Sequence, residues 1–244
     1  MSKIRKIGPG NLSVRVIDCG PIIYDEIELK QKLQFDLFKG KKSEIESLIE
    51  RSREWIDPKA VYTYIEVMEI EGDKVQLENG AMLRGVILGD LLKPGQTVAP
   101  HAVTIGSRFE DQLSKLSKES IVLGWVLDRI GNYAIRLARR NLRHRVEEGL
   151  GGEVSNFSPG TGTGKLFGIE QQAVLFQILQ PTKNIGVRLT SSYLMMPRKS
   201  VSGIFAVLGE EYDACQYCPR RCESRRSPYH GEYVPSSNRL GEAR

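Results

Sequence analysis

The sequence predicts an α+β fold in which N-terminal helices and one long helix pack on a twisted, mostly antiparallel sheet. Runs rich in β-branched and aromatic residues are typical of strands, and they occupy residues 12–18, 60–70 and 97–106. Apolar residues at helical spacing occupy residues 25–38, residues 43–56 and a long stretch that begins near residue 108. The helical stretch from 108 onward is the longest, so we expect one helix to cross the sheet.

Local signals refine these elements. Ser43 followed by Glu46 matches a capping box, which places the start of the second helix at Ser43. Pro100 cannot donate a hydrogen bond to a neighbouring strand, which favours an edge strand or a bulge there. We expect its neighbour His101 at the surface or at a strand edge. The glycine-rich stretch 149–165 is expected to be a loop.

Length and charge limit the classes of function. The 244 residues suit one domain, which we expect over residues 12–223, between a basic tail (1–11) and a polar, flexible tail (224–244). The formal net charge of +5 lies mainly at the two ends, unlike the basic face of a nucleic-acid binder. No apolar run reaches the roughly 18 residues of a membrane helix, and no signal-peptide stretch follows the N-terminus. The sequence therefore predicts a cytoplasmic protein with neither a nucleic-acid nor a membrane partner.

One side of the expected long helix is basic. Arg129, Arg136, Arg140 and Arg143 are spaced three, four or seven residues apart, which places them on neighbouring turns. Such a surface is either a solvated face or a docking surface for an acidic partner.

The cysteines form the most chemically specific motif. Cys215, Cys218 and Cys222 make a C-x2-C-x3-C pattern, which in a cytoplasmic chain favours metal binding, with a 4Fe-4S cluster ahead of zinc. A redox thiol pair, a disulfide or no cofactor at all are the alternatives. A fourth ligand would come from outside the chain or from one of three residues, namely Cys19, Asp213 and His230.

Residues 186–209, GVRLTSSYLMMPRKSVSGIFAVLG, resemble the C-terminal activation domain of cobalamin-dependent methionine synthase. Residues 158–179 are similar to the Pro-Gly loop and following helix of that family, and residues 126–146 to its long helix, with Asp128 in register. The earlier part of the chain looks more like the stand-alone, single-domain members of the family. The resemblance spans roughly residues 24–230, so it implies that family's α+β fold for most of the chain.

The resemblance also implies a function. In this family the domain binds S-adenosylmethionine and presents its methyl group to the cobalt of a cobalamin carried on another domain. Methylation traps cob(I)alamin after the inactive cob(II) form has been reduced. The chain is therefore expected to be an accessory activation subunit whose partner is a corrinoid methyltransferase or corrinoid protein. A flavodoxin or ferredoxin would be the electron donor, and the chain is not expected to turn over alone.

The family's binding residues transfer only in part. Its loop motif is Arg-x-x-x-Gly-Tyr within a Pro-Gly turn, with an acidic residue on the long helix. Here Asn156 stands in place of the arginine, Thr161 in place of the tyrosine and Asn132 in place of the glutamate. Arg188 or Lys165 could supply the charge that these replacements remove. The cofactor-binding residues that the resemblance implies are Asn132, Asn156, Pro159, Gly160, Thr161, Arg188, Ser192 and Tyr193.

Two alternatives to this function stay open. In the first, the chain keeps a corrinoid partner but delivers electrons to cob(II)alamin from an iron–sulfur cluster, without S-adenosylmethionine. In the second, the chain is a metal-stabilised interaction module that performs no chemistry.

Overall fold

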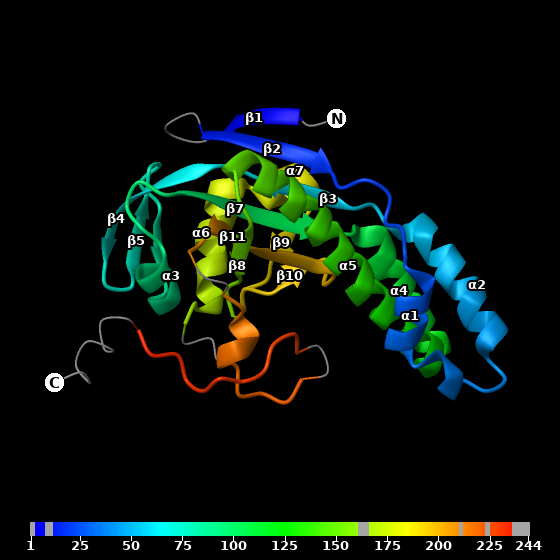
Figure 1. Ribbon diagram of the computed structural model, residues 1–244. Coiled ribbons are helices and arrows are strands. Elements are labelled where there is room, and N and C mark those ends of the chain that lie inside the picture. Colours follow the sequence, from blue (N-terminus) through cyan, green and yellow to red (C-terminus); the bar gives the residue numbers. More distant parts are fainter. Residues whose placement is uncertain (1–2, 8–11, 161–165, 210–211, 223–224, 236–244) are drawn as a thin grey trace.

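The computed structural model describes residues 3–7, 12–160, 166–209, 212–222 and 225–235. It has the predicted α+β fold, with helices packed on both faces of an antiparallel sheet (Figure 1). Within these ranges, no helix is both long and apolar enough to span a bilayer.

The sheet is built around β7 (Thr97–Thr104). One side of β7 pairs with β3 (Lys59–Tyr62) and then with β4 (Ile65–Glu71), and the other side pairs with β11 (Ser200–Val207). The remaining strands of this sheet are β8 (Val154–Phe157) beside β11, β2 (Leu12–Asp18) and β1 (Lys3–Ile7) beyond β3, and β5 (Lys74–Leu77) and β6 (Met82–Arg84) beyond β4. A second, two-stranded sheet joins β9 (Arg188–Leu189) to β10 (Met195–Met196).

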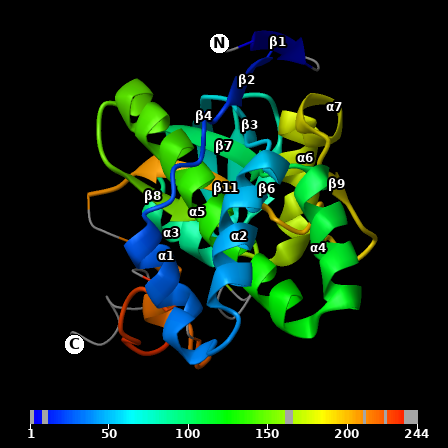
Figure 2. The ribbon, with the colours of Figure 1, turned by 90° about the vertical axis from the view of Figure 1, so that its right-hand side faces the viewer.

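The helices divide into two groups. The first group is α1 (Glu26–Leu33), α2 (Lys42–Ser52), α4 (Ser107–Glu119) and α5 (Ile121–Leu150), and Figure 2 shows α1, α2 and α4 around α5. The second group is α3 (Val86–Leu91), α6 (Gln172–Leu179) and α7 (Pro181–Ile185). The single-turn helices are η1 (Phe35–Leu37), η2 (Arg53–Trp55), η3 (Ile169–Gln171) and η4 (Ala214–Tyr217).

Alternation along β7 produces two hydrophobic cores. Ala99 and Val103 face α5 and join the core of the first helix group. Val98 and Ala102 face the other way and join the core that contains α3 and α6. Because successive side chains of a strand point to opposite faces, one strand supplies both cores.

The predicted long helix is α5, which has 30 residues. The Ser120 side chain accepts a hydrogen bond from the Leu123 amide and caps its first turn. At its other end Gly151 takes the left-handed conformation, with φ of 74°, and closes the helix. The cap at Ser120 also separates α5 from α4, which the sequence pattern had joined into one helical stretch.

Three local expectations were wrong. Helix α2 begins at Lys42, so Ser43 lies inside it, and Glu46 bonds Lys30 at 2.8 Å instead of completing a capping box. Pro100 lies in a central strand, because its missing N–H falls where β3 gives way to β4; its carbonyl still accepts from the Thr63 amide at 3.2 Å. His101 is fully buried beside it.

The packing of α4 on α5 gives a stability prediction. A Cβ at Gly124 would lie 2.7 Å from the Cα of Ser117, a backbone atom of α4 that cannot rotate away. We expect Gly124→Ala to lower the free energy of unfolding by about 1–3 kcal/mol, measured by urea denaturation. Arg140→Ala, on the exposed face of the same helix, is the control and should change it by less than about 0.5 kcal/mol. A stabilised Gly124→Ala protein, as helix propensity alone predicts, would contradict this packing.

Candidate functional site

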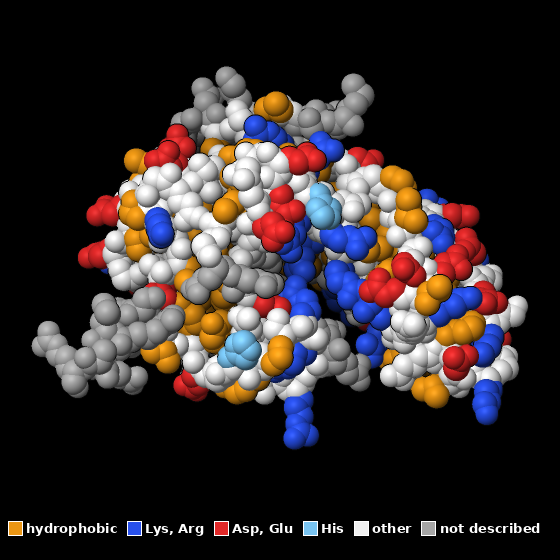
Figure 3. Space-filling view, in the orientation of Figure 1, with side chains coloured by type: hydrophobic (Ala, Val, Ile, Leu, Met, Phe, Trp, Pro, Cys, Tyr) orange, Lys and Arg blue, Asp and Glu red, His pale blue; other side chains and the backbone are white. Residues whose placement is uncertain are grey.

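A cleft of about 620 Å³ lies between α5, α1 and the segment that follows β11. Figure 3 shows a hollow in this face, with Lys and Arg side chains gathered along its walls. Val201 of β11 contributes to the cleft, and Cys215 and Arg226 line it from the C-terminal segment. Its volume is within the range of small-molecule sites.

The lining of the cleft is strongly positive. Five cationic side chains and no carboxylate line it; the cations are Lys32, Arg129, Arg136, Arg139 and Arg226. The basic face of α5 that the sequence indicated therefore lies partly in a cleft, through Arg129 and Arg136. Arg140 is exposed, and Arg143 pairs with Glu147 at 2.7 Å.

Glu28 of α1 connects α1 to the wall of the cleft. The Tyr133 hydroxyl donates to its carboxylate at 2.6 Å, and Arg136 pairs with it at 3.3 Å. The hydrogen bond from Tyr133 is the main cause that lowers the pKa of Glu28, with Lys32 and Arg136 adding to it. Burial is the main cause that raises the pKa of Tyr133, to about 12. Glu28 therefore stays ionised and Tyr133 neutral at physiological pH.

Asn132 lines the cleft, but its carboxamide is already engaged. Lys199 reaches up from the start of β11 and donates to the Asn132 Oδ1 at 2.7 Å and to the Asp128 Oδ1 at 2.6 Å. The Asn132 Nδ2 donates to the second Asp128 oxygen at 3.1 Å. Asn132 stands where the resemblance implies an acidic residue facing a ligand, and an ammonium group of the chain itself already bonds to its side-chain oxygen.

Asn156 lies on β8, opposite Phe205 of β11. Its Nδ2 donates to the Ser158 hydroxyl at 2.8 Å, whereas its buried Oδ1 has no hydrogen-bond partner among the described residues. The amide fits here because Gly203 has no side chain: a Cβ at that position would lie 2.8 Å from the Asn156 Oδ1. Gly203 belongs to the Ser-Val-Ser-Gly string, so a close approach of β8 to β11 explains its glycine.

The Pro-Gly turn follows β8. Pro159 is buried and Gly160 is exposed, with φ of 75°, a conformation that favours glycine. The Gly160 amide donates to the Phe167 carbonyl at 2.8 Å and holds the turn against the stretch before η3. Thr161 and Lys165 lie outside the described residues.

The remaining predicted cofactor residues lie in the β9–β10 hairpin. Arg188, Ser192 and Tyr193 are all exposed, and Tyr193 occupies a turn position with φ of 59°. None of the three lines the cleft. The structure therefore brings Asn132 and Cys215 to one cleft and leaves the hairpin residues outside it.

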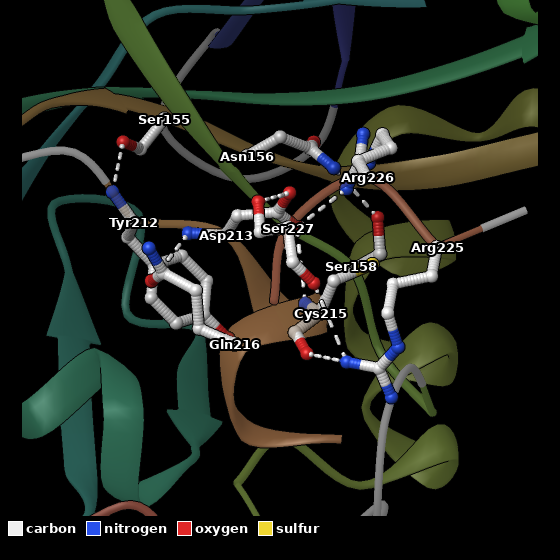
Figure 4. Close-up of polar contacts among 10 residues, drawn as sticks. All are labelled: Ser155, Asn156, Ser158, Tyr212, Asp213, Cys215, Gln216, Arg225, Arg226 and Ser227. Carbon is white, nitrogen blue, oxygen red and sulfur yellow. Dashed lines mark hydrogen bonds and ion pairs between the residues drawn. The ribbon is translucent and has the colours of Figure 1, made fainter. Parts of the chain in front are cut away.

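The cysteine segment is organised by arginine and aspartate. Asp213 caps η4 by accepting from the Cys215 amide at 3.0 Å, and it pairs with Arg226 at 2.8 Å (Figure 4). The Arg225 guanidinium donates to the backbone carbonyls of Cys215 at 2.6 Å and Cys218 at 2.5 Å. These bonds fix the course of the turn through its backbone.

The predicted metal site finds no support in this arrangement. Cys215 and Cys218 are half-buried and Cys222 is exposed, but no three His, Cys, Asp or Glu side chains in the described ranges lie close enough together to hold a metal ion. Cys19 is buried, and burial raises the pKa of its thiol to about 12, which opposes the thiolate form that a metal needs. The carboxylate of Asp213 is already committed to Arg226, so it is not a spare ligand.

Sequence reasoning missed several cleft residues. Lys199 gives no signal in the sequence, because its partners on α5 are about 70 residues away along the chain. Arg139 could have been found, since it lies three residues after Arg136 on the basic side of the long helix. Arg226 lies four residues after the cysteine motif, and nothing in the sequence places it against α5.

Comparison with known proteins adds two findings. Residues 157–216 match the family described as vitamin B12 dependent methionine synthase, activation domain. The resemblance to this family is confirmed. A solved structure titled "Crystal Structure of the MetH Reactivation Domain bound to AdoHcy" has a TM-score of 0.62 and 14% sequence identity, and the match covers 83% of this chain and 81% of that one. No curated protein matches the chain.

The first finding concerns a part of the sequence, and the second concerns the fold of most of the chain. The matched residues of the activation domain family include the Pro-Gly turn, β9 to β11 and η4. At 14% identity the structural match establishes an activation-domain fold and nothing finer. The bound S-adenosylhomocysteine is a property of that protein.

His101 gives a prediction about pH. Burial lowers the pKa of this histidine from 6.5 to about 3, so the unfolded chain takes up a proton there at pH values where the folded chain does not. The free energy of unfolding therefore falls as the pH drops below about 6.5, by up to about 1.4 kcal/mol per pH unit for this one group.

We expect His101→Phe to remove that contribution, so that urea denaturation between pH 6.5 and 4 gives a shallower pH dependence. Asn79→Ala, in the turn between β5 and β6, is the control because it removes no titratable group, and its pH dependence should match the wild type. Equal slopes for His101→Phe and wild type would show that His101 is protonated in the folded protein.

Proposed function

We propose that this chain is an accessory activation subunit that restores the reduced corrinoid of a cobalamin-dependent methyltransferase, with methionine synthase as the first candidate. The match of residues 157–216 to the activation domain family is the observation that carries the proposal. An activation-domain fold over 83% of the chain supports it.

The proposed reactivation needs three participants besides this chain: an electron donor, the corrinoid protein and S-adenosylmethionine. One electron from a donor such as a flavodoxin or ferredoxin reduces cob(II)alamin on the partner protein. The methyl group of S-adenosylmethionine then moves from sulfur to cobalt and leaves S-adenosylhomocysteine. This chain would hold the methyl donor and dock the corrinoid carrier.

The residues of this chain would bind S-adenosylmethionine weakly. Asn132 and Asn156 are neutral where the family has charged groups, and each lost charge-assisted hydrogen bond is worth about 1.5–3 kcal/mol. The Asn132 oxygen is also engaged by Lys199. The Asn156 Oδ1, which has no partner among the described residues, is the acceptor best suited to an ammonium group of a ligand.

Calorimetry on the purified chain tests this step. We expect S-adenosylmethionine to bind with a Kd between about 10 µM and 1 mM, and Asn156→Ala to weaken binding about five- to tenfold, which corresponds to one hydrogen bond. Asn79→Ala, in the turn between β5 and β6, should leave the Kd unchanged. A Kd weaker than millimolar for the wild type would exclude the methyl-donor role.

A reconstituted assay tests the corrinoid role itself. The chain is mixed without oxygen with cob(II)alamin-loaded methionine synthase that lacks its own activation domain, together with reduced flavodoxin and S-adenosylmethionine. We expect methylcobalamin to form with one S-adenosylhomocysteine per corrinoid. If the partner's cob(II)alamin is consumed at the same rate without S-adenosylmethionine, the electron-delivery alternative replaces the proposal.

No step of the proposal passes through a metal cluster, because the described cysteines have no metal-binding geometry. Metal and acid-labile sulfide analysis of oxygen-free protein separates the alternatives. Brown protein with iron and sulfide would favour electron delivery from a cluster on Cys215, Cys218 and Cys222. Colourless protein with stoichiometric zinc would favour the interaction module.

A further inference from the structure

The cysteine segment holds a cluster of nucleophilic side chains that the proposed activation role does not use. All four cysteines of the chain are free thiols in this structure, and Cys19 is buried in the hydrophobic core. Cys215 and Cys218 are half-buried and Cys222 is exposed, so reagents in solution can reach these three. Two thiols can be oxidised together to a disulfide when the backbone already holds them at the distance that the bond requires.

Cys215 and Cys218 lie at the two ends of one tight turn. Cys215 belongs to the single-turn helix η4, and Cys218 is the C-terminal cap of that helix. The Cys218 amide donates to the Cys215 carbonyl at 3.4 Å. In a helix of this kind, side chains three residues apart lie one above the other, with Cα atoms about 6 Å apart. Disulfides join Cα atoms that are about 4.4–6.8 Å apart, so this pair can bond without rearrangement of the backbone.

Arg225 fixes this turn through the backbone. Its Nη1 donates to the Cys215 carbonyl at 2.6 Å, and its Nη2 donates to the carbonyls of Cys218 at 2.5 Å and Arg220 at 2.8 Å (Figure 4). A planar guanidinium holds its donors in fixed positions, so the two cysteine carbonyls keep their separation. Cys222 begins the next turn, where its carbonyl accepts from the Arg225 amide at 3.1 Å. These contacts favour Cys218 over Cys222 as the partner of Cys215.

A guanidinium lies beside the Cys215 sulfur. Burial acts to lower the pKa of Arg226, but the charge of Asp213 and a hydrogen bond to the Cys215 side chain raise it above its ordinary value. A cation next to a sulfur atom stabilises the thiolate, which is the form that attacks a disulfide. Residues 215–226 contain four arginines and one acidic residue, so the segment also attracts an anionic reagent.

We propose that Cys215 and Cys218 form a reversible disulfide by exchange with a small anionic disulfide. The Cys215 thiolate attacks one sulfur of the reagent, whose S–S bond breaks and releases a thiolate that takes up the proton lost by Cys215. Cys218 then attacks the Cys215 sulfur of the mixed disulfide, and the second thiol leaves with the proton of Cys218. The two cysteine sulfurs lose two electrons, which reduce the reagent to two thiols. This modification site goes beyond the proposed activation role and does not depend on it.

Peptide mass spectrometry tests the pairing. The full chain, purified without oxygen, is treated with oxidised glutathione, its remaining thiols are alkylated, and the protein is digested with trypsin. Cleavage after Lys199 and Arg220 leaves Cys215 and Cys218 together in the peptide of residues 200–220. Cys222 falls in a later peptide. We expect the peptide of residues 200–220 to become two hydrogen atoms lighter, and an excess of reduced glutathione to restore it.

Two serine variants identify the partners. Cys218→Ser should stop at one glutathione bound to Cys215, because no second thiol is in place to release it. Cys222→Ser is the control and should leave the change in the peptide of residues 200–220 as it is in the wild type. A disulfide that links two peptides through Cys222, or mixed disulfides that never close, would overturn the proposal. Thiols that stay unreactive because they hold a metal ion would overturn it too.

The rate of disulfide formation tests the position of Arg226. We expect Arg226→Gln to slow the reaction with oxidised glutathione at least about fivefold, because the attacking thiolate loses its neighbouring cation. Arg221→Gln removes the same charge from an exposed residue of the same segment and should slow it less than about twofold. Arg226→Lys keeps the charge and should retain most of the rate. Equal slowing in Arg226→Gln and Arg221→Gln, or in Arg226→Gln and Arg226→Lys, would overturn Cys215 as the attacking thiol.

Discussion

The structure depends on β7 being covered on both faces and paired on both sides. Its side chains alternate between two hydrophobic cores, so α5 and its neighbouring helices on one face and α3 and α6 on the other are held by a single strand. β11 extends this arrangement and brings Val201 and Gly203 under α5, and Lys199, just before β11, bonds to Asp128 and Asn132 of α5. The cleft therefore lies between α5, α1 and the segment that follows β11. The two hydrophobic cores on either face of β7 fix the positions of the elements that form its walls.

The spacing of apolar residues along the sequence was sufficient to predict the main strands and helices of the fold. Helix α5 was expected from spacing alone, because its apolar residues recur on one face that the fold buries. Strand β2 was expected from its run of β-branched residues. Local signals were less reliable when tertiary contacts overrode them. Pro100 is tolerated in a central strand because the neighbouring strand is interrupted beside it, and that interruption is not visible from residue 100.

The candidate site was predicted only where a resemblance or a motif pointed to it. The Pro-Gly turn and Gly203 lie within the resembling strings. Gly203 lies where β8 and β11 approach closely, and Gly160 takes a left-handed conformation against Ile169. The cleft as a whole was not predictable. Arg139 lies on the basic side of the long helix, but Lys32 and Arg226 come from two distant parts of the chain and look in the sequence like ordinary surface cations. Charge that is dispersed in sequence becomes concentrated only after α1, α5 and the C-terminal segment meet.

The backbone bonds of Arg225 determine which substitutions the cysteine segment can tolerate. A single guanidinium donates to the backbone carbonyls of Cys215, Cys218 and Arg220, so it holds the turn without using any thiol. The shape of the segment is therefore independent of the sulfur atoms. Replacing the cysteines one at a time would leave these three backbone bonds in place, whereas loss of the arginine would release all three carbonyls at once.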